Sequence, residues 1–234
     1  ARMIISGYEV MGDSPFKDVY FTSILRDETG AKFSKSLGNS PDPFTLFDDY
    51  GTDAVRFGIM LMAPQGLDVL FSPKGLEVGR NFINKLWNAS RFRQMQGGPE
   101  GLTRLPDIEN LSIYDIDILS KLDALRDDIS ASYSAYKFQE IANKLYDFFW
   151  SEFCDWYLES IKQYFREDAD SERRDTVLIV VDIVFARFLQ QLHPYMPHIT
   201  EELWEKLGFA VDGALLMNAH LPEDPVMKGF DSKI

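Results

Sequence analysis

The chain has 234 residues, of which 45% are hydrophobic and 26% are charged, and its formal net charge is −13. Such a chain can bury a sizeable core and forms one large or two small domains. No apolar run approaches the roughly 20 residues that cross a bilayer, and no secretory signal is present, so we expect no membrane anchor and a cytoplasmic location. Neither a disulfide nor a metal site is expected, because Cys154 is the single cysteine and no His or Cys pair has zinc spacing.

The charge is distributed unevenly along the chain. Residues 72–104 hold six Lys or Arg against two Asp or Glu, whereas residues 1–71 hold six against ten and residues 105–234 hold twelve against twenty-five. Exposed charges are screened beyond about 8 Å at physiological salt, so the cationic segment keeps its own attraction for anions. The acidic total therefore predicts weak binding to nucleic acid rather than none.

The first predicted elements are a helix and a hairpin. Apolar residues within 1–12 recur at helical spacing and no start signal precedes Ala1, so we expect a helix at the cut edge of a longer chain. Residues 18–25 are β-branched and aromatic, which predicts a buried strand. The glycine-containing turn "RDETGAK" then predicts a return into a short second strand.

A cationic, hydroxyl-rich loop follows that hairpin, with the sequence "GAKFSKSLGNSPDP" at residues 30–43. Lys32 and Lys35 stand three residues apart, so their ammonium groups can reach different oxygens of one polyphosphate, while Ser34 and Ser36 add hydrogen bonds. The simpler interpretation is a solvated turn, because glycine, asparagine and proline are ordinary loop residues. A Walker A loop is excluded, since its G-x-x-x-x-G-K-[ST] pattern is absent.

Two short helices with clear boundary signals come next. Asp42 precedes a proline and reads as the N-cap of a helix over 43–50, which a glycine ends. A second helix is predicted over 53–62, with Thr52 and Asp53 as its capping residues and a proline soon after its end.

A long third helix is predicted from Ser72-Pro73 to about Met95. Successive residues lie about 100° apart on a helix, so an apolar face is expected from Val78, Phe82, Leu86 and Ala89. A different face carries polar and cationic side chains that can follow the phosphates of an RNA: Arg80, Asn84, Asn88 and Arg91. The alternative for this second face is a solvated surface without a ligand.

The remainder of the chain is almost wholly helical in pattern. Apolar residues recur every three or four positions from residue 113, the pattern continues through 136–165 and 174–192, and a short helix ends at Gly208. We therefore predict an antiparallel helical bundle over 113–208.

The aromatic and histidine residues of this bundle are interpreted as structural. The aromatic series in 138–165 has the spacing of a core, which we favour over base-stacking platforms for RNA. His193 and His198 flank prolines at a helix junction, where local hydrogen bonds are common, and Cys154 is predicted to be an inert core thiol.

The loop sequence "KFSKSLGN" resembles the KMSKS signature of class I aminoacyl-tRNA synthetases, with Phe33 in place of the usual methionine. The resemblance continues in order through "YGTDAVRF" (50–57), "APQGLDVLF" (63–71), "GRNFINKLWNASRF" (79–92), "FWSEFCDWYLE" (149–159) and "LHPYMPHITEELW" (192–204). The combination is most similar to the valyl branch. An isoleucyl or leucyl branch, and a non-catalytic helical protein-interaction module, are the alternatives.

This resemblance implies a mainly α fold in three parts. Residues 1–40 would be the end of a Rossmann-type catalytic domain, a small α/β remnant that carries the loop. Residues 41–97 would be a helical segment that contacts the tRNA stem, and residues 98–234 the α-helical anticodon-binding domain.

The resemblance also implies roles for the loop. In the intact enzyme, ATP with Mg²⁺ and an amino acid, valine in this branch, form an aminoacyl-adenylate and pyrophosphate, and the acyl group passes to tRNA(Val). Lys35 would stabilise the α-phosphate transition state and the leaving pyrophosphate. Lys32 and the hydroxyls of Ser34 and Ser36 would support it.

Other family elements are missing from the sequence. The only histidines are His193, His198 and His220, so the His-x-Gly-His type element of the active site is absent. The amino-acid pocket and the editing domain lie upstream in the family. We therefore expect half an active site, no bound ATP and no activity in this chain alone, and a monomeric parent that binds neither DNA nor a membrane.

Overall fold

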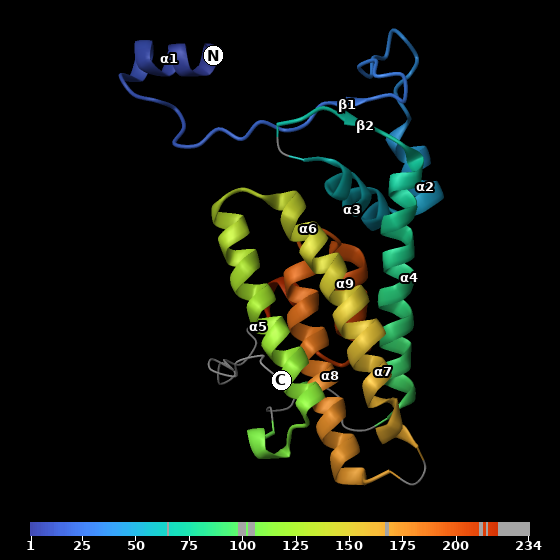
Figure 1. The fold of residues 1–234 in the computed structure, drawn as a ribbon. Helices are drawn as coiled ribbons and strands as arrows, with labels where there is room; N and C mark the ends of the chain where they lie inside the picture. Colours follow the sequence, from blue (N-terminus) through green and yellow to red (C-terminus); the bar gives the residue numbers. More distant parts are fainter. Residues whose placement is uncertain are drawn as a thin grey trace.

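A computed structural model describes residues 1–64, 66–97, 102, 106–166, 169–210, 213 and 215–219. Helices dominate this part of the chain, and the sheet found there has two short strands. Figure 1 shows a helical bundle with a long helix, α4, along its side and an irregular segment above it that contains the strands. The mainly α fold class predicted from the sequence is confirmed.

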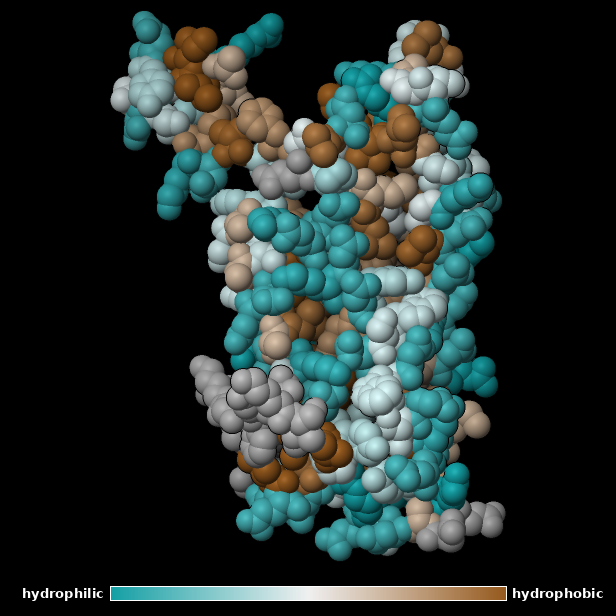
Figure 2. Space-filling view, in the orientation of Figure 1, coloured by the Kyte–Doolittle hydropathy of each residue, from teal (hydrophilic) through white to brown (hydrophobic). Residues whose placement is uncertain are grey.

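The helix α1, Arg2–Met11, forms where it was predicted and ends at Gly12, whose φ of 72° is left-handed. None of its residues is buried, and apolar side chains such as Met3, Ile5 and Met11 are exposed. An extended segment joins it to the rest, and Figure 2 shows its apolar side chains on the surface. The apolar face of α1 is therefore left exposed to solvent in the described part of the chain.

The predicted strand over 18–25 is wrong. Strand β1 comprises only Leu25–Arg26, and it pairs in parallel with β2, Val69–Leu70. A strand needs a neighbour for its backbone groups. The pairing with β2 reaches back only to Ile24, whose carbonyl oxygen accepts a 2.9 Å hydrogen bond from the Val69 amide. The return strand is reduced to a single antiparallel bridge between Arg26 and Lys32.

The next three helices confirm the predicted boundaries. They are α2, Pro43–Tyr50, α3, Thr52–Met62, and α4, Pro73–Met95. Asp42 caps α2 as predicted, since its carboxylate accepts a hydrogen bond of 3.1 Å from the Phe44 amide.

Glycine allows α3 and α4 to approach closely. A Cβ atom at Gly79 would lie 2.4 Å from the Ala54 carbonyl oxygen, and one at Gly58 would lie 2.8 Å from the Gly75 carbonyl oxygen. Either side chain would force the two helix backbones apart. The helical segment that follows the lysine-containing loop is thereby held rigidly against α4.

The predicted capping of α3 is wrong. Its N-cap is Gly51 and has no side-chain cap, while Asp53 is buried and accepts a 2.7 Å hydrogen bond from the Ile199 amide. That amide lies in the first turn of α9, Pro197–Lys206. Asp53 therefore caps a helix far away in the sequence, because α9 begins against α3 and presents unsatisfied N–H groups there.

The predicted helical bundle is confirmed. Its long helices are α5, Ile113–Ser134, and α8, Ser171–Leu192, and between them lie α6, Phe138–Asp147, a π-helix η2, Phe148–Tyr157, α7, Leu158–Ile161, and a 3₁₀ turn η3, Lys162–Phe165. Short 3₁₀ turns η1, Ile108–Asn110, and η5, Leu216–Asn218, flank the bundle in sequence.

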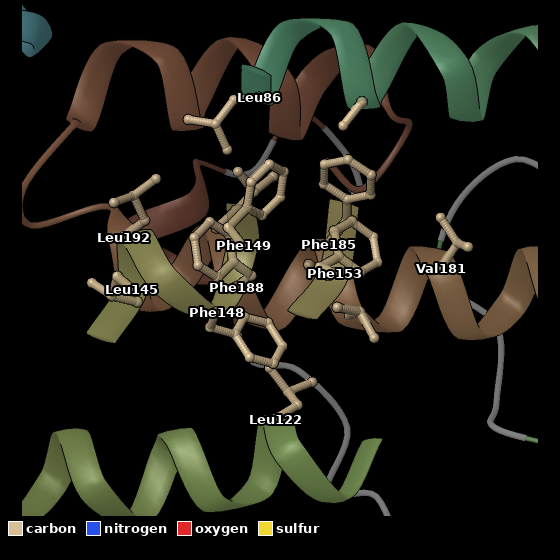
Figure 3. Packing of buried hydrophobic residues seen from close by; sticks show 14 of the residues in the cluster. Leu86, Leu122, Leu145, Phe148, Phe149, Phe153, Val181, Phe185, Phe188 and Leu192 are labelled. Atoms are coloured by element: carbon tan, nitrogen blue, oxygen red, sulfur yellow. The ribbon is translucent and has the colours of Figure 1, made fainter. Parts of the chain in front are cut away.

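The aromatic series forms the core, as predicted. Phe149 stacks on Phe188 with ring centroids 4.7 Å apart, and Phe153 meets Phe185 edge-on at 5.2 Å. Figure 3 shows these rings between α4, η2 and α8. One member departs from the prediction, because Trp156 is 55% exposed: the π-helix turns it away from the core-facing row.

Candidate phosphate and nucleic-acid interface

The loop predicted to bind phosphate begins with a tight turn after β1. The Gly30 amide donates to the Asp27 carbonyl oxygen at 2.9 Å, and Gly30 has a φ of 85°, which only glycine adopts without strain. Arg26 holds this turn from outside, with one guanidinium nitrogen 3.2 Å from the Gly30 carbonyl oxygen and another 2.6 Å from the Asp68 carboxylate. In Figure 1 the loop stands between β1 and α2, away from the bundle.

The two lysines of the loop are both available to a ligand. Lys32 and Lys35 are exposed, and within the described part of the chain neither ammonium group has a hydrogen-bond or ion-pair partner. Their charges are therefore solvated rather than neutralised, which an anion-binding site requires.

The two serines lie between and beside the lysines. The hydroxyls of Ser34 and Ser36 are 2.8 Å apart and hydrogen-bonded to each other. Ser34 is half-buried and Ser36 is exposed. The structure thus brings all four predicted loop residues into one turn, with backbone hydrogen bonds from Leu37 and Gly38 to the carbonyls of Ser34 and Lys35.

Phe33, between the lysines, anchors the loop to the body of the protein. Its ring meets Phe71 edge-on with centroids 5.9 Å apart, next to a small cluster that includes Val55 and Leu76. The Phe33 side chain therefore packs against the body of the protein and makes no charged contact.

The polar face predicted on α4 is exposed over its whole length. Arg80, Asn84, Asn88 and Arg91 are all exposed. The Arg80 guanidinium lies 5.3 Å from the centre of the Tyr50 ring, which orients it by a cation–π contact. The apolar face differs from the prediction at one position, because Val78 is 38% exposed and Gly79 instead faces α3.

Lys85 is a surface cation of α4 that the sequence reasoning missed. Its ammonium lies 2.7 Å from an Asp155 carboxylate oxygen and 4.7 Å from the centre of the Trp150 ring, and that ring stacks on Tyr146. No signal in the sequence pairs residues 85 and 155, which meet only because η2 packs beside α4. Its charge is already neutralised, so Lys85 is a poorer candidate for phosphate than its exposed neighbours.

Arg93 is a second missed residue of α4, and it is buried. Two of its guanidinium nitrogens lie 2.6 Å from the two carboxylate oxygens of Asp182 in α8, and a third lies 2.8 Å from the Gly97 carbonyl oxygen. The helical spacing from Phe82, Leu86 and Ala89 places residue 93 on the apolar face, so this pair could have been found as a charge in an apolar row.

Three other titratable residues are held by contacts or burial within the fold. His193 is hydrogen-bonded to the Thr200 hydroxyl at 2.8 Å, which confirms its predicted local role, and His220 lies outside the described residues. Burial raises the pKa of Cys154 to about 12, so it is a neutral thiol at physiological pH. Desolvation also raises the pKa of Asp182, which its ion pair with Arg93 opposes.

Two further properties apply to the described part of the chain. No helix there is long and apolar enough to span a membrane. No group of three or more His, Cys, Asp or Glu side chains there could hold a metal ion.

Two family models match the chain in succession. The model for class I tRNA synthetases (I, L, M and V) matches residues 1–72, and the model for the anticodon-binding domain of tRNA ligase matches residues 115–234, which is more than half of the chain. The chain belongs to the family of the anticodon-binding domain of tRNA ligases. The first match contains the cationic loop over residues 30–43, the lysine loop, and the second contains most of the bundle.

Several proteins that are similar to this chain are valine-tRNA ligases. A valine-tRNA ligase of Petrotoga mobilis is 43% identical over 95% of this chain, one of Bacteroides fragilis is 44% identical over 95%, and one of Porphyromonas gingivalis is 42% identical over 99%. The chain spans about a quarter of the length of these relatives, 25%, 25% and 26% respectively.

Solved structures show the same fold at lower identity. A leucyl-tRNA synthetase of Agrobacterium radiobacter K84 has a TM-score of 0.67 at 17% identity, over 92% of this chain and 26% of that one. A methionyl-tRNA synthetase of Mycobacterium tuberculosis has a TM-score of 0.71 at 17% identity, over 89% of this chain and 42% of that one. The fold of this chain is therefore one that is found within known synthetases.

Proposed function

We propose that this chain is the part of a valine-tRNA ligase that binds tRNA(Val) and supplies one half of the ATP phosphate site. The observation that carries the proposal is the identity of 41–44% to valine-tRNA ligases along nearly the whole chain, in which the lysine loop precedes the anticodon-binding bundle. We extend the proposal to three parts, 1–40, 41–97 and 98–234, and to a monomeric, cytoplasmic parent.

The lysine loop acts on ATP in this proposal. When the valine carboxylate attacks the α-phosphate of ATP, the α-phosphate and the departing pyrophosphate gain negative charge. Lys35, helped by Lys32, stabilises that charge, and the two serine hydroxyls donate hydrogen bonds to phosphate oxygens. The two ammonium groups are exposed and have no partner among the residues that the structure describes, which supports this role, because a bound polyphosphate would displace no described partner. Mg²⁺ accompanies the ATP phosphates in this reaction and needs no dedicated carboxylate cage in the loop.

The exposed face of α4 contacts the RNA backbone in this proposal. Arg80 and Arg91 stand on a helix in the cationic segment 72–104, and Asn84 and Asn88 lie between them. Arginines position an RNA through its phosphates, and asparagines can donate to phosphate or read a base edge.

Titration of the chain with tRNA(Val) and tRNA(Ile) at two salt concentrations tests the function. We expect tRNA(Val) to bind more tightly, and log affinity to fall with log salt. In Arg80→Ala/Arg91→Ala the slope should decrease in magnitude by about 1.4 to 1.8, the contribution of two phosphates. The matched control Lys137→Ala/Lys162→Ala removes two exposed cations outside α4 and should leave the slope nearly unchanged.

Other results would redirect the proposal. Preference for tRNA(Ile) would indicate the isoleucyl branch, and the same design with tRNA(Leu) tests the leucyl branch. No binding to any tRNA at low salt would favour a helical module that contacts protein. Because the chain covers a quarter of its relatives, we expect no adenylate formation by it alone, and detection of ATP–pyrophosphate exchange would contradict this.

A further inference from the structure

We propose that Asp27 and Asn39 are positioning residues that hold the lysine loop in its phosphate-binding shape. Neither belongs to the four loop residues considered above, and both lie outside the lysine–serine run itself. The inference rests on the proposed phosphate role of that loop. It assigns to an acidic side chain a positive contribution to the binding of an anion, which charge alone would not predict.

Asp27 organises the first arm of the loop. One carboxylate oxygen accepts hydrogen bonds from the Thr29 amide at 3.0 Å, the Thr29 hydroxyl at 2.6 Å and the Ala31 amide at 2.9 Å. These bonds, together with one from the Asn39 side chain, lower the pKa of Asp27 to about 2, so it is ionised at neutral pH. The first arm is therefore fixed by a permanent carboxylate.

Asn39 connects that carboxylate to the second arm. Its amide nitrogen donates to the other Asp27 carboxylate oxygen at 2.7 Å and lies 3.4 Å from the Lys32 carbonyl oxygen. Its amide oxygen accepts from the Ser34 backbone N–H at 2.9 Å. The loop is thus tied at residues 32 and 34, on both sides of Phe33 and directly before Lys35.

The donor and acceptor roles in this chain of hydrogen bonds cannot be exchanged. A carboxylate at position 27 only accepts, so the Asn39 nitrogen must face it and the Asn39 oxygen must face Ser34. If the amide were reversed, two oxygens would meet at Asp27 and the Ser34 N–H would face a donor. The pair therefore fixes one orientation of the backbone between the lysines.

Pre-organisation explains why this matters for a flexible ligand site. Two lysine side chains carry large rotational freedom, and an unfixed backbone would add to the entropy lost when both ammonium groups contact one polyphosphate. The hydrogen bonds of Asp27 and Asn39 remove the backbone part of that entropy loss before the ligand binds. The negative charge of Asp27 is already satisfied by four donors, which limits its repulsion of phosphate.

The test measures binding of inorganic tripolyphosphate by this chain at low salt in metal-free buffer, followed by NMR through the backbone amides of residues 30–38. We expect Asp27→Ala, Asp27→Asn and Asn39→Ala each to weaken binding about fivefold or more, and to speed hydrogen exchange of the Ser34 amide. Simple electrostatics predicts the reverse for both Asp27 variants, since each removes a negative charge close to an anion.

A charge swap provides the matched control. In Asn39→Asp two carboxylates face each other, and binding should fall. In Asp27→Asn/Asn39→Asp the new amide at position 27 donates to the new carboxylate at position 39, whose other oxygen accepts from the Ser34 amide. The net charge of the loop equals that of the unaltered chain, so we expect both affinity and Ser34 exchange to return to within about twofold of the original values.

The outcomes separate this inference from the function it rests on. Suppose that the unaltered chain binds tripolyphosphate and that Lys32→Ala/Lys35→Ala does not. If the Asp27 and Asn39 variants then bind as well as the unaltered chain or better, the positioning role is overturned and the phosphate role stands. Failure of the swap to restore binding would also overturn the positioning role. If the unaltered chain itself binds no tripolyphosphate, the phosphate role of the loop is overturned, and the positioning role that rests on it is overturned with it.

Discussion

Charged residues serve opposite purposes in the lysine loop and in the contact between α4 and α8. In the loop, Lys32 and Lys35 are exposed and carry no ion pair within the described residues. Between the helices, Arg93 and Asp182 are 7% and 4% exposed and bind each other through two hydrogen bonds. A charge remains available for a ligand where water solvates it, whereas a buried charge must be satisfied by the protein itself.

The largest loss of stability is expected when the buried ion pair between Arg93 and Asp182 is removed. Asp182→Ala leaves the Arg93 guanidinium buried without its carboxylate, and we expect the free energy of unfolding to fall by about 3–5 kcal/mol. Urea unfolding followed by circular dichroism measures this. The control Arg93→Met/Asp182→Leu removes both charges and should recover most of the lost stability. If Asp182→Ala lowers the free energy of unfolding by less than about 1 kcal/mol, the structural role of the pair is contradicted.

Asp53 is expected to have the next largest effect. Asp53→Ala removes the cap on the Ile199 amide, which should cost about 1–2 kcal/mol of unfolding free energy. Asp53→Asn keeps an acceptor and serves as the control in the same urea experiment. Equal stability of the original chain and the alanine variant would show that α9 does not depend on this cap.

Asp53 also gives a prediction in pH. Burial raises its pKa above the ordinary value of 3.8, so the folded chain holds this proton more tightly than the unfolded chain. Its contribution to stability is therefore greatest below that ordinary value and decreases as the pH rises through the raised pKa. Unfolding measured from pH 3.5 upward should show this decrease in the original chain and a flatter profile in Asp53→Asn. Identical profiles would contradict it.

Lys85 tests the intermediate case of a charge that is paired and only half-buried. Lys85→Ala removes the ion pair with Asp155 and the contact with Trp150, and we expect a loss of about 1 kcal/mol or less. The effect should shrink in high salt, which thermal unfolding at two salt concentrations can show. A loss near that of Asp182→Ala would mean that burial does not separate the two kinds of charge.

The smallest effect on stability is expected in the loop. Lys32→Ala/Lys35→Ala removes two solvated charges, so the free energy of unfolding should change by no more than about 0.5 kcal/mol while tripolyphosphate binding is lost. Urea unfolding and the NMR titration give the two values. A large loss of stability would place these lysines in the structure rather than in a ligand site.

Local sequence signals predicted most helices and failed where a partner decided the outcome. The boundaries of α2 and α4 followed from Asp42, Pro43 and Pro73, because capping acts within one turn of the chain. The strand over 18–25 was wrong, since a strand exists only beside another strand. Asp53 was misassigned for a similar reason: a cap can serve any helix end that comes near, and sequence distance does not limit it.

The candidate site divides in the same way. Residue types and short spacings were enough to predict the helices, the cationic loop with Lys32, Ser34, Lys35 and Ser36, and the exposed polar face of α4. Three contacts became visible only in the folded chain: Asn39 joins Asp27 to Ser34, Arg93 meets Asp182, and Lys85 is paired with Asp155. These contacts depend on where the chain returns in space, and the geometry of hydrogen bonds and ion pairs is fixed only once both partners are in place.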